Sequence, residues 1–377
     1  TSIDLAAGND VLNLGAGPAT LSVTNVETVV GGAGIDAVTM KGALSNVSVD
    51  LGAGSDTLNL DNTANTLSVT NTETVIGGSA VDTVTLSGAV ASASIDLAGG
   101  NDVLTLSNGT NSLTANNVET VTGGTGADSV TLAGSLTTSM TVDLATGNDT
   151  LTLAAASGNT GSVTGVETLV GAAGVDAITV IGVLSNASLD LAGGADTATL
   201  ANGANVLTAT NVETITGGTG VDTVTLSGTV SGTSVDLAAG NDVLNLGAGP
   251  TTLSVTNVET VTAGSGVDTV TMKAALSNVS IDLGAGSDTV NLDNTANTVS
   301  IANTETIIGG SAVDTITLSS AASNASIDLA GGNDVLTFGN GSNTASVANV
   351  ETVTGGTGAD TVTLSSALTT GMTVDLG

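Results

Sequence analysis

Apolar and polar residues alternate in short stretches that return along the whole chain. In the stretch DTVTL, residues 82–86, Val84 and Leu86 fall on one side of an extended backbone and Thr83 and Thr85 on the other. A period of two over a few residues is the pattern of a half-buried β-strand. Glycine pairs or Gly-x-Gly separate these stretches, and segments with a helical period are absent. The pattern therefore predicts an all-β protein of short strands and tight turns.

The strand pattern belongs to a repeat of about 46 residues, a period typical of stacked repeat architectures. The tripeptide VET or TET marks this repeat and returns eight times along the chain. A longer period lies above it, because residues 236–377 closely repeat residues 4–145 at an offset of 232, or five repeats. We interpret residues 1–377 as a single continuous repeat array and expect it to be a window of a longer one.

Each repeat holds two glycine turns that end in aspartate, which suggests two coils per repeat. A coil of this size cannot bury its own apolar face, but stacked coils cover one another. The predicted fold is a parallel β-solenoid, with about 16 coils of ~23 residues in the eight repeats.

Composition excludes several classes of function. The 377 residues include 35 Asp and Glu against two Lys, a net charge of −33, and there is no His, Cys or Trp. Nothing can neutralise phosphates, so nucleic-acid binding is excluded, and thiolate zinc sites, disulfides and a Ser-His-Asp triad are excluded as well. We expect no enzyme activity. No apolar run reaches the ~18 residues of a membrane-spanning helix, so membrane insertion is not expected.

Nearly every carboxylate occupies one of four periodic sets, and only Asp61 and Asp293 lie outside them. The first set precedes a leucine: Asp4, Asp50, Asp96, Asp143, Asp190, Asp236, Asp282, Asp328 and Asp375. The second set closes the following glycine turn: Asp10, Asp56, Asp102, Asp149, Asp196, Asp242, Asp288 and Asp334. The third set closes the other glycine turn: Asp36, Asp82, Asp128, Asp176, Asp222, Asp268, Asp314 and Asp360. The fourth set contains the VET glutamates: Glu27, Glu73, Glu119, Glu167, Glu213, Glu259, Glu305 and Glu351.

The glycine turns resemble those of a known family. GGTGAD (123–128), GGTGVD (217–222), GGAGID (31–36) and DLGAGSD (50–56) are similar to the glycine- and aspartate-rich nonapeptide of RTX proteins, the hemolysin-type calcium-binding repeats. The resemblance implies a β-roll whose turns bind Ca²⁺. RTX repeats follow one another directly, whereas the turns of this chain occur only once per expected coil, which implies a wider solenoid. The NVETVTGG context also resembles repetitive regions of secreted bacterial S-layer and adhesin proteins.

Alignment on the glycine turns would place the second and third sets in one column. Carboxylates ~4.8 Å apart repel by about 3.5 kcal/mol per pair at an effective dielectric of ~20. Sixteen of them would then exceed the ~5–15 kcal/mol net stability of a typical domain. Oxygen ligands without nitrogen or sulfur favour Ca²⁺. We therefore expect multiple Ca²⁺ ions, held by the second and third sets and, less strongly indicated, by the first set or the VET glutamates.

Other interpretations of the same residues stay open. Aspartate after glycine also occurs as an ordinary turn residue that binds its own backbone, and exposed acids also serve only solvation. Some turns depart from the motif, for example at Ala80, Ala172, Ala263 and Ala312, and these turns would bind an ion more weakly if glycine there needs a positive φ. An outward Thr and Asn ladder, which includes Thr39, Asn59, Thr85, Thr105 and Thr131, offers an alternative role in binding ice or another ligand.

Together the patterns predict a calcium-stabilised extracellular structural protein, a rod that forms a fibre, surface layer or adhesin stalk. The expected partner is the protein itself, through head-to-tail or lateral association, with a cell-surface polysaccharide or another surface component as a further candidate. The resemblance to RTX proteins implies a bacterial protein, secreted by a type I route to the cell surface or medium.

Overall fold

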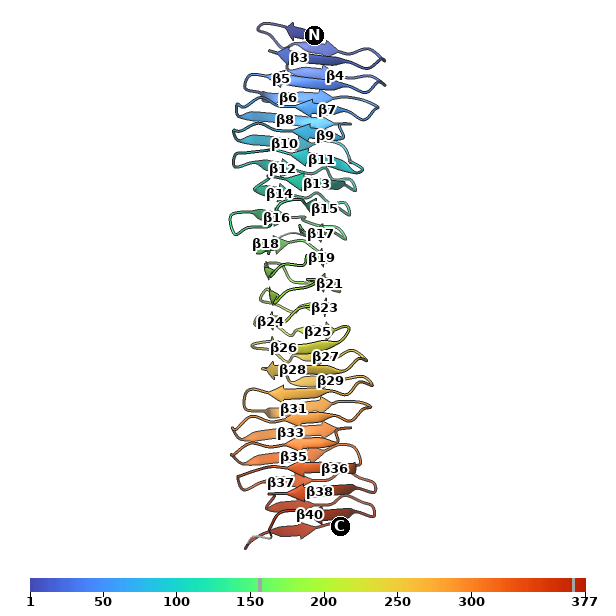
Figure 1. Ribbon diagram of the computed structural model, residues 1–377, viewed down its shortest axis with the longest axis vertical. Coiled ribbons are helices and arrows are strands. Elements are labelled where there is room, and N and C mark those ends of the chain that lie inside the picture. Colours follow the sequence, from blue (N-terminus) through green and yellow to red (C-terminus); the bar gives the residue numbers. More distant parts are fainter. Residues whose placement is uncertain (155–157, 368–369) are drawn as a thin grey trace. The chain divides into compact units, whose positions relative to one another are not determined.

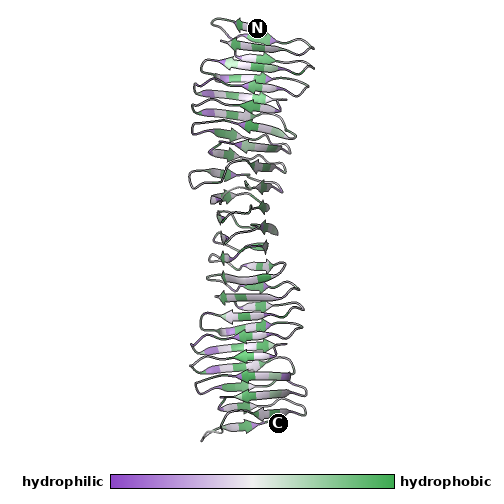
Figure 2. Ribbon diagram, viewed as in Figure 1, coloured by the Kyte–Doolittle hydropathy of each residue, from purple (hydrophilic) through white to green (hydrophobic). Residues whose placement is uncertain are grey.

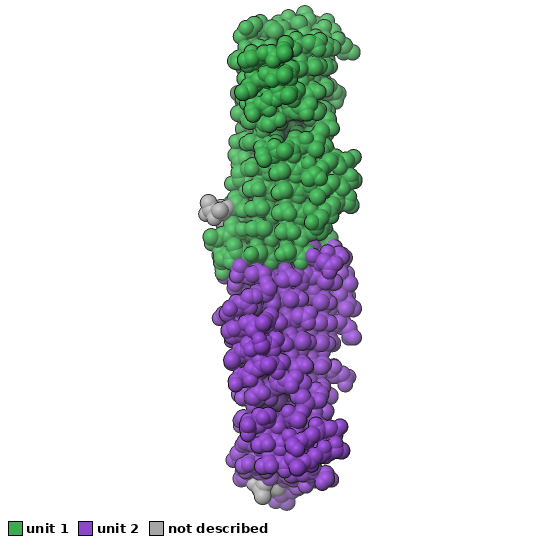
Figure 3. Space-filling view, turned by 90° about the vertical axis from the view of Figure 1, so that its right-hand side faces the viewer, with its two compact units in different colours: residues 1–182, 187–194 green, residues 183–186, 195–377 purple. Residues whose placement is uncertain are grey.

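A computed structural model describes residues 1–154, 158–367 and 370–377. The described residues form short parallel β-strands and no helix, which confirms the predicted all-β parallel solenoid (Figure 1). Within these ranges there is accordingly no helix long and apolar enough to cross a bilayer. The chain divides into two compact units, Thr1–Gly182 with Ala187–Gly194, and Val183–Asn186 with Ala195–Gly377 (Figure 3).

In each compact unit, odd-numbered strands build one sheet and even-numbered strands a second. The first unit has these odd-numbered strands: β1 (Ser2–Asp4), β3 (Thr20–Thr24), β5 (Ala37–Lys41), β7 (Thr57–Asn59), β9 (Thr74–Ile76), β11 (Ala93–Asp96), β13 (Ser112–Asn116), β15 (Ser129–Leu132), β17 (Thr150–Thr152), β19 (Thr168–Val170) and β21 (Ala187–Asp190). Its even-numbered strands are β2 (Val11–Asn13), β4 (Thr28–Val30), β6 (Ser45–Asp50), β8 (Asn65–Thr70), β10 (Asp82–Leu86), β12 (Val103–Thr105), β14 (Thr120–Thr122), β16 (Thr141–Asp143), β18 (Thr160–Thr164) and β20 (Ala177–Val180).

The second unit repeats this arrangement. Its odd-numbered strands are β23 (Val206–Thr210), β25 (Thr223–Leu226), β27 (Val243–Asn245), β29 (Thr260–Thr262), β31 (Ser277–Asp282), β33 (Asn297–Ala302), β35 (Asp314–Leu318), β37 (Val335–Thr337), β39 (Thr352–Thr354) and β41 (Thr373–Asp375). Its even-numbered strands are β22 (Thr197–Thr199), β24 (Thr214–Thr216), β26 (Val230–Asp236), β28 (Thr251–Thr256), β30 (Thr269–Met272), β32 (Thr289–Asn291), β34 (Thr306–Ile308), β36 (Ser323–Asp328), β38 (Thr344–Ala348) and β40 (Thr361–Leu364).

The coils are shorter and more numerous than the sequence suggested. Thr20 pairs with Ala37 one coil later, Ala37 pairs with Thr57, and Ser129 pairs with Thr150, so each of these steps is shorter than the expected coil. The expected number and length of the coils are therefore wrong, although the fold class is confirmed. The expectation counted only the two glycine turns of each repeat, whereas the VET segment forms a further corner without glycine.

Each sequence repeat supplies five strands, for example β6 to β10, and successive strands alternate between the two sheets. Because five is odd, a given strand type lies in one sheet in one repeat and in the other sheet in the next. The strand that accompanies the third-set aspartate is even-numbered as β10 and odd-numbered as β15. The structural period is thus two sequence repeats, or five coils.

The core lies between the two sheets and consists of stacked aliphatic side chains. Leu58 pairs with Val75, which pairs with Ile95, and all three are fully buried. Full burial of such a side chain contributes about 1.5–3 kcal/mol. Val84 and Leu86 are buried while Thr83 and Thr85 are half-buried, as the alternation predicted. Hydrophobic residues recur at matching places on successive strands (Figure 2).

Candidate functional site

The second- and third-set aspartates do not form the single column that the sequence suggested. Asp36 and Asp56 precede the odd-numbered strands β5 and β7, whereas Asp102 precedes the even-numbered β12. Two columns result, one beside each sheet, because each strand type changes sheet from one repeat to the next. Along one column the carboxylates come in groups of three coils, in the order third-set aspartate, second-set aspartate and VET glutamate.

Within a group, the second-set aspartate and the VET glutamate each accept a hydrogen bond from a backbone N–H of the coil before them. The N–H of Asp82 donates to Oδ1 of Asp102 at 2.7 Å, and the N–H of Asp102 donates to Oε2 of Glu119 at 2.8 Å. The first kind of bond also joins Asp36 to Asp56 and Asp268 to Asp288. These charge-assisted bonds fix the carboxylates between consecutive coils.

A buried asparagine precedes most of these groups. Nδ2 of Asn111 donates to Oδ1 of Asp128 at 2.8 Å and also to the carbonyl oxygens of Gly109 and Ser107. Equivalent side chains that donate to the third-set aspartate one coil later are Asn65, Asn159, Asn205, Asn297 and Asn343. Sequence reasoning missed these residues, although their return at matching places in successive repeats was a visible signal.

Most second-set carboxylates are only half satisfied. Asp56, Asp102 and Asp288 have no exposed surface, yet one oxygen of each lacks a partner. Within the described part of the chain, no group donates a hydrogen bond to the Oδ2 atoms of these aspartates: Asp10, Asp56, Asp102, Asp149, Asp242, Asp288 and Asp334. A buried carboxylate oxygen without a partner is costly unless a proton or a cation reaches it.

Glycine makes room for these carboxylates. A Cβ added to Gly54 would lie 2.6 Å from Oδ1 of Asp56 and 2.4 Å from the carbonyl oxygen of Gly34 in the neighbouring turn. Gly147 stands in the same relation to Asp149 and to the carbonyl oxygen of Gly126. The glycine two residues before a second-set aspartate therefore leaves a space that a carboxylate and a carbonyl oxygen share.

The glycines of the GGxG turns serve close packing rather than a positive φ. A Cβ on Gly31 would lie 2.1 Å from the carbonyl oxygen of Leu51, and one on Gly32 2.3 Å from that of Gly15. Neither residue is among those with positive φ. The expectation that alanine would weaken such turns by straining the backbone is therefore wrong. The distance to the backbone of the neighbouring coil, and not φ, determines whether a side chain fits there.

Burial and neighbouring charges change the acidity of the second set. Burial raises the pKa of Asp102 to about 6, and the charges of Asp82 and Glu119 act in the same direction. The pKa of Asp334 is raised to about 6 by the same kind of causes, burial first and then the charges of Asp314 and Glu351. Burial also raises the pKa values of Asp56 and Asp288. In the absence of a cation, ionisation of these groups near neutral pH therefore opposes folding.

The donor set fits a hard cation. Oδ2 of Asp149 and Oδ2 of Asp288 have no donor in the described chain and lie beside the spaces at Gly147 and Gly286, which a carbonyl oxygen of the preceding coil also lines. Oxygen-only sites of this kind suit Ca²⁺. Over the described ranges, no three or more acidic, histidine or cysteine side chains gather as a metal site. An ion held here would therefore use one or two aspartates and complete its shell with carbonyl oxygens and water.

The first-set aspartates serve a different corner. Oδ1 of Asp4 accepts hydrogen bonds from the N–H of Ala6 at 3.0 Å and from Nδ2 of Asn25 at 2.8 Å. These bonds lower the pKa of Asp4. Asn25 has a φ of 52° and Ala6 a φ of 66°, so the aspartate caps two left-handed residues at once. The pattern returns with Asp96, Ala98 and Asn117.

The VET glutamates and the threonine ladder also take definite places. Thr28 pairs with Ser48, so Glu27 lies one coil from Val47 and not from Asp50. Thr85 pairs with Thr105 in the even-numbered sheet, whereas Thr131 pairs with Thr152 in the odd-numbered sheet. The expected continuous ladder through Thr85, Thr105 and Thr131 is therefore wrong, for the same reason as the single aspartate column.

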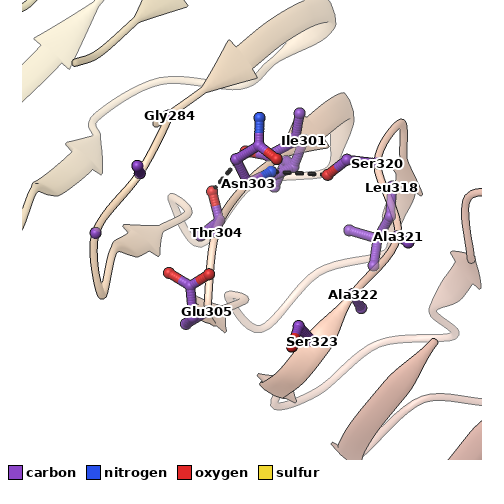
Figure 4. A pocket seen from close by; sticks show the side chains of 13 residues that line it. Gly284, Ile301, Asn303, Thr304, Glu305, Leu318, Ser320, Ala321, Ala322 and Ser323 are labelled. Carbon is purple, nitrogen blue, oxygen red and sulfur yellow. Dashed lines mark hydrogen bonds between the residues drawn. The ribbon is translucent and has the colours of Figure 1, made fainter. Parts of the chain in front are cut away.

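Small cavities open between the VET corner and the loop that follows the neighbouring strand of the same sheet, one coil later. One of about 300 Å³ has Thr304 and Glu305 on one side and Ser320, Ala321 and Ala322 on the other (Figure 4). Among the described residues that line it, Glu305 is the one with an ionisable side chain. A cavity with one carboxylate and hydroxyl groups lacks the paired groups of general acid–base catalysis.

No known protein family matches the chain, and no curated protein resembles it.

Proposed function

We propose that this β-solenoid is a structural protein of the bacterial surface or extracellular space, stabilised by Ca²⁺ in its glycine turns. One observation carries the proposal: the buried aspartates Asp149 and Asp288 keep an Oδ2 without a donor in the described chain, beside a glycine space that a carbonyl oxygen of the preceding coil also lines. A calcium ion would satisfy these oxygens and offset the repulsion within each carboxylate group. The resemblance to RTX repeats supports the same ion and an extracellular site, where calcium is abundant.

Repetition supports a structural rather than a catalytic role. The same strands return along the described chain, and a repeated unit of this kind supports a role that the whole array serves. A stiff array of this kind would serve as a fibre, a surface layer or an adhesin stalk, through association with further copies or with surface polysaccharide. No observation favours the ice-binding alternative, because the threonine rows are short: the row Thr85, Thr105 and Thr122 is followed by Asp143 on the next coil.

Calcium removal and return test the proposal. Far-UV circular dichroism and thermal melting would be recorded on the full chain in chelator, then in millimolar Ca²⁺, with Mg²⁺ as the comparison ion. We expect loss of β signal or a much lower melting temperature in chelator, and recovery with Ca²⁺ but not with equal Mg²⁺. An unchanged spectrum and melting temperature, together with no measurable calcium binding, would contradict it.

A further inference from the structure

The carboxylate pair Asp36 and Asp56 differs from most others. In the pair Asp82 and Asp102, Oδ1 of Asp82 accepts from Nδ2 of Asn65 at 2.7 Å and Oδ2 accepts from the N–H of Gly78 at 3.1 Å. Asp82 is therefore satisfied by protein groups alone. In that pair only Asp102 retains an oxygen without a donor among the described residues.

The asparagine is missing before Asp36. Ala19 takes its place, and its N–H gives Oδ1 of Asp36 a hydrogen bond at 2.8 Å. Oδ2 of Asp36 has no donor in the described chain, and Oδ2 of Asp56 has none either. Both side chains are fully buried, and the N–H of Asp36 binds Oδ1 of Asp56, so the two carboxylates lie on adjacent coils.

The asparagine is also missing at the equivalent turn in the later copy of the array. Thr251 stands where the asparagine would be, and its hydroxyl donates to the carbonyl oxygen of Gly249 instead. Both oxygens of Asp268 and Oδ2 of Asp288 lack a donor in the part of the chain that the structure describes. Asp268 and Asp288 are fully buried as well.

The nearest lysine in the sequence serves another carboxylate. Lys41 lies at the far end of β5, the strand that follows Asp36, and its charge helps to lower the pKa of Asp61, after the hydrogen bonds from Gly42 and Asn62. On the next coil, Oε2 of Glu73 accepts from the N–H of Asp56, which adds a third carboxylate to the group. The pair Asp36 and Asp56 therefore has a negative neighbour, and an added cation would relieve its repulsion.

We propose that the pairs Asp36–Asp56 and Asp268–Asp288 are two distinguished calcium sites, which bind the ion more tightly than the other glycine turns. This inference rests on the proposed calcium-stabilised function. Two carboxylates with free oxygens replace the one that other turns offer, and affinity for Ca²⁺ rises with the number of charged ligands. In the pairs Asp82–Asp102 and Asp314–Asp334, Oδ2 of the third-set aspartate accepts from the N–H of Gly78 or Gly310, and no such donor reaches Oδ2 of Asp36 or Asp268 in the described chain.

Removing one charge from each pair tests the inference with little disturbance, since asparagine has nearly the shape of aspartate. Calcium binding to the chelator-stripped full chain would be measured by isothermal titration calorimetry at pH 7.5. We expect two tight sites, about tenfold stronger than the rest. Asp36→Asn and Asp268→Asn should each leave one tight site, and the double variant none, with the weaker sites retained. Asp82→Asn, at a third-set aspartate whose two oxygens both have protein donors, is the control and should keep both.

A second matched variant gives an independent check. Asp314→Asn changes a third-set aspartate whose oxygens accept from Asn297 and Gly310, and it should also keep both tight sites. Two tight sites that persist in the Asp36→Asn/Asp268→Asn double variant would overturn the inference. A single class of equal sites in the unmodified protein would overturn it too, while the proposed function would stand. Absence of any calcium binding would overturn both.

Discussion

Replacing the buried Asp102 by asparagine should stabilise the protein when calcium is removed. The side chain has no exposed surface, and Oδ2 has no donor in the described chain. An asparagine can keep the acceptor for the N–H of Asp82 through its own oxygen. Its Nδ2 would then take the place of Oδ2, and no charge would remain in the buried site.

The pKa of Asp102 sets the magnitude and the pH range. Burial raises it from 3.8 to about 6, so the folded state holds a proton between pH 4 and 6 that the unfolded state releases. Stability therefore falls as pH rises through this range, and the full cost is present above pH 6. Two pH units correspond to about 3 kcal/mol, and an effective dielectric above that of a dry interior reduces this to about 1–3 kcal/mol.

Urea denaturation in chelator, followed by circular dichroism, measures the effect. Asp102→Asn should raise the free energy of unfolding by about 1–3 kcal/mol at pH 7.5 and have little effect at pH 4. Asp61→Asn, at an acid outside the carboxylate groups, should change stability by no more than about 0.5 kcal/mol at pH 7.5. If Asp102→Asn instead destabilises the chelated protein at pH 7.5, the carboxylate is not held at an electrostatic cost and the reasoning fails.

Three further substitutions test other parts of the structure, each by urea denaturation in the presence of calcium. Gly54→Ala should lower the free energy of unfolding by several kcal/mol, because its Cβ would lie 2.4 Å from a backbone oxygen. Its control Gly42→Ala, which has open space and a φ of 83°, should lower it by only about 1 kcal/mol. Equal effects would contradict the clearance argument. Asn205→Ala should cost about 2–4 kcal/mol, since it removes the buried amide that donates to Asp222 and to two carbonyl oxygens, and a cost below ~1 kcal/mol would show that the amide bonds matter little. Ala98→Gly should stabilise by up to about 1 kcal/mol, because Ala98 has a φ of 65° where Gly52 occurs in a neighbouring repeat, and a loss of stability would refute the strain there.

Local patterns in the sequence were enough to predict the strands and the core. Alternation over residues 82–86 correctly placed Val84 and Leu86 on the same, buried side, because side-chain direction in a strand follows directly from residue order. The turns that end in Asp36 and Asp56 were also recognised, since their glycines are needed for close contact between coils.

The coil count and the stacking partners could not be predicted in the same way. The corner at Asn71 has no glycine, and a left-handed asparagine held by Asp50 takes its place. Because that corner was not recognised, the sequence did not reveal the odd number of strands per repeat. The change of sheet in successive repeats was missed for the same reason. Identical sequence positions, such as Asp36 and Asp82, therefore lie in different columns. Sequence identity between repeats does not establish spatial contact when the strand count is odd.

A crystal structure of the full chain grown with millimolar Ca²⁺ at pH 7.5 tests the central claim most directly. We predict an ion within about 2.3–2.6 Å of Oδ2 of Asp56, with a second contact to Oδ2 of Asp36 or to a turn carbonyl oxygen. Anomalous scattering would identify the ion, and the Asp36→Asn variant should show weaker density there. A folded solenoid whose second-set aspartates contact only water or protein donors under these conditions would contradict the account.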